Sequence, residues 1–184
     1  MGLLGRWLST SLALALGLGG AVLAMQVPAF TQHYLAGLQQ AAGELDRSVA
    51  DRLQSGRTTY DLVGSDRETV AGLATREPSN AATLSRDLDR RDSHAAILAA
   101  AQAASPITRP IATAWAITTG PEGWRSPVVA TALATYDAGI ALTGAAILWG
   151  LAGLVVGVLL AQLLALPFHR RPRMAVTIDR SRLL

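Results

Sequence analysis

The sequence predicts an all-α membrane protein in which two transmembrane helices are joined by a helical extramembrane segment. Of its 184 residues, 51% are hydrophobic and only 16% are charged, which is more apolar than a typical soluble domain. Two uncharged apolar stretches are long enough to cross a hydrocarbon core of about 30 Å. Between them, apolar residues recur at spacings of three and four, without the alternation of a β-strand.

The first apolar stretch spans residues 7–25 and follows a short N-terminus of residues 1–6. At 1.5 Å per residue, an uncharged helix of this length just crosses the bilayer. A cleavable secretory leader is the alternative, because Arg6 supplies a positive start and Val22-Leu23-Ala24 resembles a cleavage site. We favour an uncleaved transmembrane anchor.

Residues 26–126 are predicted to form the helical extramembrane segment. A capping box at Ser65-Asp66-Arg67-Glu68 announces a second helix, which follows a first helix that we expect to end near Gly56. A third helix is expected from Ser79 or Asn80 to about Ala104. The apolar stripes of these three helices comprise Phe30, Tyr34, Leu38, Ala42, Leu45, Val49 and Leu53, then Val70, Leu73 and Ala74, then Leu84, Leu88, Ala95 and Leu98.

Residues 107–124 are apolar but are not expected to form a third span. Arg109-Pro110 and Gly120-Pro121 would leave backbone groups without partners in lipid. Trp115 and Trp124 either lie at the membrane surface or cap the small helical core. Together with Tyr34 and Tyr136, we predict them to be interfacial anchors.

The second span is predicted over residues 138–166, where only Thr143 and Gln162 interrupt the apolar run. Ser126 followed by Pro127 has the pattern of an N-cap with proline in the first turn. We therefore expect one long helix from Pro127 to Leu166, in which residues 127–137 form the extramembrane start. Residues 167–184 form a basic tail.

The arginines predict the orientation. Arg170, Arg171 and Arg173 follow the second span directly, whereas residues 26–137 contain ten arginines and twelve acidic residues. By the positive-inside tendency, we expect both termini to be cytoplasmic and the middle segment to be periplasmic or otherwise outside.

Composition removes several kinds of chemistry. The chain contains no Cys, and all of its sixteen basic residues are Arg. These absences exclude thiolate nucleophiles, cysteine zinc sites, iron–sulfur ligation and Schiff-base lysines. Outside the tail there is no basic patch interleaved with aromatic residues, so we expect no nucleic acid partner. We predict no catalytic residue, no metal site and no cofactor.

The densest polar cluster is the run from Asp87 to His94. Helical spacing brings Asp87, Arg91 and His94 to one side, which would suit a metal or an acid–base pair. Alternating charges on a helix are more typical of a solvated face, which is the interpretation that we favour. His33 near the first span is likewise expected to be an anchor rather than a proton carrier.

Small residues on both spans predict close helix packing. Gly153 and Gly157 form a GxxxG pattern that Ala161 extends, and Gly17 and Gly20 give the first span a similarly smooth surface. Such surfaces allow two helix backbones to approach closely. We expect them to pack against each other or against another membrane protein.

The N-terminal third resembles a bacterial family of small two-span inner-membrane proteins that is classed as a domain of unknown function. The residues that carry the resemblance are Leu14 to Ala21, Gln26-Val27-Pro28, Phe30, Gln32, Tyr34, Leu38 and Glu44-Leu45, supported by Pro106 to Pro110 and the C-terminal span with its arginine tail. The resemblance implies an inner-membrane hairpin and brings no known activity, cofactor or catalytic residue.

We therefore expect a non-catalytic accessory or scaffold subunit that packs against a larger membrane complex, for example a respiratory or photosynthetic one. Its expected partners are membrane lipids and either other integral membrane subunits or a second copy of itself. The alternative is an envelope protein that self-assembles through the helix at residues 30–53. An enzyme that acts through His94 or His33 ranks third.

Overall fold

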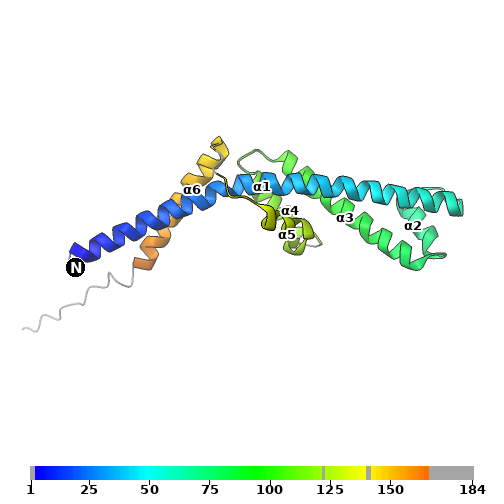
Figure 1. The fold of residues 1–184 in the computed structure, drawn as a ribbon, viewed down its shortest axis with the longest axis horizontal. Helices are drawn as coiled ribbons and strands as arrows, with labels where there is room; N and C mark the ends of the chain where they lie inside the picture. The colour runs from blue at the N-terminus through cyan, green and yellow to red at the C-terminus, as the bar shows by residue number, and fades with distance from the viewer. Residues whose placement is uncertain (1–2, 122, 140–141, 166–184) are drawn as a thin grey trace, which may run out of the picture.

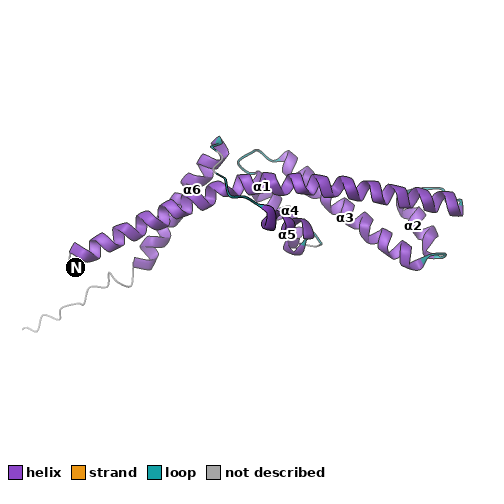
Figure 2. Ribbon diagram, in the orientation of Figure 1, coloured by secondary structure: helices purple, strands orange, loops and turns teal. Residues whose placement is uncertain are grey.

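The computed structural model describes residues 3–121, 123–139 and 142–165. These residues form six α-helices and a short 3-10 helix, with no strand among them (Figure 2). The molecule is elongated: α1 runs along most of its length, α6 crosses the first half of α1, and the other helices lie along the second half (Figure 1). The predicted all-α fold is confirmed for the described residues.

Helix α1 (Leu3–Tyr60) is one unbroken helix of 58 residues, about 87 Å long at 1.5 Å per residue. It passes through Pro28, whose missing N–H removes one bond of the helical ladder. One turn further on, the Thr31 hydroxyl donates to the Val27 carbonyl oxygen at 2.8 Å. The first apolar stretch and the first amphipathic stripe therefore belong to the same rod.

Gly56 does not end α1, contrary to our expectation. A Cβ at this position would lie 3.0 Å from Cδ1 of Leu73, so the glycine lets α2 pack closely on α1. The helix continues to Tyr60 and is followed by Asp61 in the left-handed conformation, with φ of 52°. Such a residue is a common way to end a helix.

Helices α2 (Asp66–Ala74) and α3 (Pro78–Ala103) fold back on the far end of α1. The predicted capping box is confirmed, since Ser65 accepts from the Glu68 backbone N–H and Glu68 accepts from that of Ser65. Ala74 is exposed, whereas Thr69 occupies the buried face instead. The core of this region comprises Val49, Leu53, Leu73, Ala81, Leu84 and Leu88.

The middle of the molecule is built by α4 (Arg109–Thr119), the 3-10 helix η1 (Gly123–Arg125) and α5 (Pro127–Thr135). They pack with α3 against α1 around a second core of Tyr34, Leu38, Ile97, Ile117, Val129 and Ala132. On α3, Ile97 and Ala101 are buried rather than the predicted Ala95, which is exposed. The region between the two apolar stretches thus has its own helical core.

The single helix that we expected from Pro127 to Leu166 is divided into α5 and α6 (Gly144–Ala165). Tyr136 contacts Gln26 of α1, and Gly150 contacts the adjacent Met25. A continuous helix would place residues 136 and 150 about 21 Å apart along its axis, so the chain must break between them. Thr143 starts the new helix by accepting from the Ala146 backbone N–H at 3.2 Å.

Candidate functional site

The first candidate site is the crossing of α1 and α6, where four of the predicted packing glycines meet. A Cβ at Gly20 would lie 2.5 Å from the carbonyl oxygen of Gly153. A Cβ at Gly153 or Gly157 would collide with the backbone of α1, at Gly20 and Leu16 respectively. Backbone therefore rests directly on backbone, the close approach that small residues permit.

The two helices run antiparallel. Gly150 lies against Met25, Gly153 against Gly20, and the Cβ position of Gly17 lies 3.1 Å from Val158. Ala161, one turn beyond Gly157, is also buried. The predicted packing surfaces of α1 and α6 thus contact each other within one chain, and they do not lie on the outer faces of this helix pair.

The outer faces of α1 and α6 are apolar and exposed. The most hydrophobic stretches of the two helices have mean hydropathies of 1.8 and 2.3, and only 11% and 17% of their residues are buried. A core helix of a soluble protein would be mostly buried. Both helices are long and apolar enough to span a membrane, and the exposed residues are Leu14, Leu18, Val22, Leu23, Leu151, Val155, Val156, Leu159, Leu160, Leu163 and Leu164.

The predicted interfacial aromatic residues have different surroundings. Tyr34 is only 2% exposed and lies in the core between α1, α3, α4 and α5, so its expected surface position is wrong. The reason is that it shares one face of α1 with Leu38, and that face is covered. Trp115 and Trp124 are exposed. Tyr136 is half-buried, and its ring packs edge-on against that of Phe30 with the ring centroids 5.4 Å apart.

The charged run at the middle of α3 is not simply a solvated face. Asp87, whose side chain is 14% exposed, accepts a hydrogen bond from Arg52 of α1 at 2.7 Å. Arg91 donates to Asp66 of α2 at 3.1 Å, and Arg57 of α1 donates to the same carboxylate at 3.0 Å. These ion pairs connect α3 to α1 and α2, and so stabilise the packing of the three helices at the far end of α1.

Several carboxylates at this far end have shifted pKa values. Burial raises the pKa of Asp66, but hydrogen bonds and positive charge from Arg91 and Arg57 outweigh it, so its pKa is lowered. The pKa of Glu77 is lowered by hydrogen bonds from Tyr60 and Asn80. The capping contacts from Ser65 lower the pKa of Glu68. The charged forms of all three are therefore favoured by the fold.

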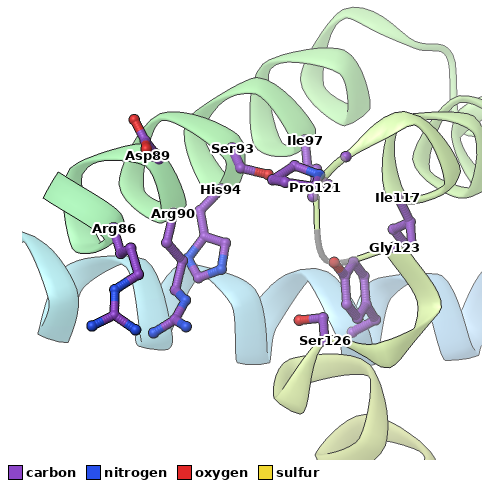
Figure 3. A pocket seen from close by; sticks show the side chains of 12 residues that line it. Arg86, Asp89, Arg90, Ser93, His94, Ile97, Ile117, Pro121, Gly123 and Ser126 are labelled. Carbon is purple, nitrogen blue, oxygen red and sulfur yellow. The ribbon is translucent and has the colours of Figure 1, made fainter. Parts of the chain in front are cut away.

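A small cavity of about 260 Å³ lies between α3, α1 and the chain around η1 (Figure 3). His94 is 5% exposed and lines it with Tyr34 and Ser126, both also buried. Figure 3 shows Arg86 and Arg90 on the same side as His94, with Asp89 directed away from them. Ser93 and His94 are adjacent on the helix and point in different directions, so they do not form a nucleophile–base pair.

We missed the burial of His94 from the sequence. The signal was its spacing of three residues from Ile97 and seven from Ala101, which places it on the same buried stripe of α3. No group of three or more metal-ligating side chains occurs in the described ranges. His33 is exposed, with its Nε2 atom 3.1 Å from the Thr135 hydroxyl. Arg170, Arg171 and Arg173 lie outside the described residues.

Comparison with known proteins identifies a family for this chain but no activity. The family model described as a protein of unknown function (DUF2937) matches residues 8–174. No curated protein and no solved structure matches the chain. The match extends over both candidate spans and the helical segment between them, which confirms the expected resemblance to a family of unknown function. The chain belongs to the DUF2937 family.

Proposed function

We propose that the chain is an inner-membrane protein with two spans, cytoplasmic termini and a periplasmic arm made of α2 to α5 and the second half of α1. The apolar, exposed faces of α1 and α6 support membrane insertion. The arginines after α6 support the orientation, because positive residues are retained on the cytoplasmic side.

Within this arrangement, the chain acts as a non-catalytic scaffold or accessory subunit for a larger membrane complex. The observation that carries this proposal is the continuity of α1, which is one helix through both the apolar anchor and the polar arm. A continuous helix fixes the height and direction of the arm relative to the bilayer. Such a rod suits a protein that holds a partner at a set distance from the membrane.

The proposed partner surface is a groove of about 560 Å³ between α1 and α5. It lies in the part of the arm that is close to the anchor, and small residues such as Ala36, Gly37 and Ala41 form its floor on α1. Apart from its chain neighbours and its own helix backbone, a Cβ at Gly37 would meet no atom of the described residues within 4 Å. The groove therefore has room for side chains of an integral membrane subunit that stands beside the anchor.

Self-assembly through the stripe at residues 30–53 is the second candidate. Tyr34, Leu38 and Val49 of that stripe are each at most 2% exposed, because α2 to α5 cover them. A homodimer would have to use another face of α1 or open the arm. This burial favours the accessory subunit over self-assembly.

The test is purification of the tagged protein in mild detergent, followed by mass spectrometry of the native particle. We expect stoichiometric recovery of other membrane subunits, and we expect Gly37→Trp to abolish it by filling the groove. Gly43→Trp is the matched control, because its Cβ also has open space but lies on another face of α1. Recovery of the chain alone would contradict the accessory role, and a small homo-oligomer would favour self-assembly.

A further inference from the structure

Helix α4 presents an exposed apolar face that nothing in the described chain covers. Ile111 and Trp115 are four residues apart in α4 and therefore lie on one side of the helix. Ile107, in the turn just before α4, is also exposed. Ile111 is 60% exposed and Trp115 is 71% exposed. If the arm were wholly surrounded by water, this contiguous apolar patch would be exposed to solvent, which is energetically unfavourable.

The opposite side of α4 is anchored in the arm. Pro110, Thr113 and Ile117 are buried there. Arg109, the only charged residue from 107 to 121, turns inward and donates to the carbonyl oxygens of Ala101 and Ala104 at 3.0 and 3.4 Å. The outward side of α4 thus carries no charge, and the hydroxyl of the exposed Thr118 there donates to the Ala114 carbonyl oxygen of the same helix.

The same face lies next to the candidate spans. The indole Nε1 of Trp149 on α6 donates to the carbonyl oxygen of Ile107 at 3.0 Å. Val27 of α1 and Trp149 line one apolar groove together with Ile111 and Trp115. The exposed surface of α4 is therefore continuous with the exposed apolar surface of the spans, at the level where α1 leaves the anchor.

We propose that α4 lies in the outer interface of the same bilayer, with Ile107, Ile111 and Trp115 among the acyl chains just below the phospholipid headgroups. An uncharged helix face bearing isoleucine and tryptophan has the composition of an interfacial helix. The occupant of this face is lipid, because the surface it continues faces lipid along the spans. This inference rests on the proposed membrane insertion, and it makes α4 a third membrane contact that sets the height of the arm.

Spin labelling tests the proposal on the full-length protein in phosphatidylglycerol–phosphatidylethanolamine vesicles. The chain has no Cys, so single cysteines at Ile111, Leu151 and Ala95 can each carry one label, and all three positions are exposed. Leu151 on α6 is the control for a span, and Ala95 on α3 is the control for the water-exposed arm. The measurement is the accessibility of each label to oxygen relative to a water-soluble nickel chelate.

We expect the label at 111 to favour oxygen over the chelate, as at 151, and to lie at a shallower depth. The label at 95 should favour the chelate. A label at 111 that behaves like the one at 95, while 151 stays in lipid, would overturn the inference and leave membrane insertion intact. Access of the chelate to 151 would refute insertion itself. A label at 111 that is immobilised in native membranes but mobile in vesicles would assign the face to a protein and overturn the lipid assignment.

Discussion

The hydroxyl of Tyr136 donates a hydrogen bond to the side-chain oxygen of Gln26 at 2.8 Å, across 110 positions of sequence. The contact joins the end of α5 to α1 just before Pro28. It lies where the apolar half of α1 gives way to the polar half. Any force that moves the arm relative to the anchor therefore acts on this bond.

Removing that bond alone should loosen the junction. We expect Tyr136→Phe to lower the free energy of unfolding by about 1 kcal/mol, the usual net value of one hydrogen bond. The ring is kept, so its edge-on contact with Phe30 survives. Tyr136→Ala should cost more, because it also removes that contact. Unfolding followed by circular dichroism in detergent measures both, and equal stability of Tyr136→Phe and wild type would contradict this role.

The glycine contact between α1 and α6 gives a second prediction. Gly153→Leu should force the helices apart, because even a Cβ at this position collides with the backbone of Gly20. Gly19→Leu is the matched control, since outside its own helix backbone no atom of the described residues lies within 4 Å of its Cβ position. The added side chain would enter the open groove beside the crossing and not the glycine contact itself.

A disulfide reports on this contact directly. The chain has no Cys of its own, so a protein with Met25→Cys and Gly150→Cys contains only these two cysteines. The Cβ position of residue 150 lies 2.6 Å from the Met25 Cγ atom. We expect Gly153→Leu to reduce the yield of this disulfide severalfold and Gly19→Leu to leave it unchanged. Equal yields in both variants would show that the helices do not depend on the glycine contact.

The ion pair between Arg52 and Asp87 is predicted to stabilise the arm. Its hydrogen bond is 2.7 Å long and the Asp87 side chain is largely covered. A double-mutant cycle with Arg52→Ala and Asp87→Ala should give a coupling of about 1 kcal/mol. The pair Arg67–Asp89 is the comparison, because both of its side chains are more than half exposed, and its coupling should be clearly smaller because water screens the two charges. Equal couplings would mean that burial adds nothing at Asp87.

The sequence predicted the helices better than it predicted their contacts. The capping box located the start of α2, and the pattern of α3 located both of its ends to within one or two residues, because capping and amphipathicity are local signals. The break between α5 and α6 was missed, since nothing local forbids a helix from Pro127 to Leu166. It arises because residues 136 and 150 both pack at one level of α1, which only the tertiary fold determines.

The same distinction applies to the candidate sites. Small residues predicted close packing, but their spacing could not tell whether the partner was this chain or another. His94 and Tyr34 were misplaced because a polar or aromatic side chain on a helix fits both a surface and a core. Which of the two it occupies depends on the neighbouring helix, and here α1 and α3 bury both residues.

Acid should loosen the far end of the arm first. Asp66, Glu68 and Glu77 all have lowered pKa values in the folded protein. A carboxyl group whose folded pKa lies below its unfolded pKa contributes stability that is complete above the unfolded value, near pH 4, and is lost as the pH falls through the folded value. Hydrogen exchange should therefore accelerate in α2 below about pH 4, before it does in α6, where no described residue is acidic.

The variant Glu77→Gln makes this prediction specific. It keeps the shape of the side chain but removes the charge that accepts from Tyr60 and Asn80. We expect faster exchange around residues 60–80 at pH 7 and a smaller further increase on acidification than in wild type, because one of the three titrating groups is gone. Glu44→Gln is the control: this exposed carboxylate accepts a hydrogen bond from Gln40 of its own helix. An unchanged acid response in Glu77→Gln would mean that the Tyr60 and Asn80 contacts do not stabilise the end of the arm.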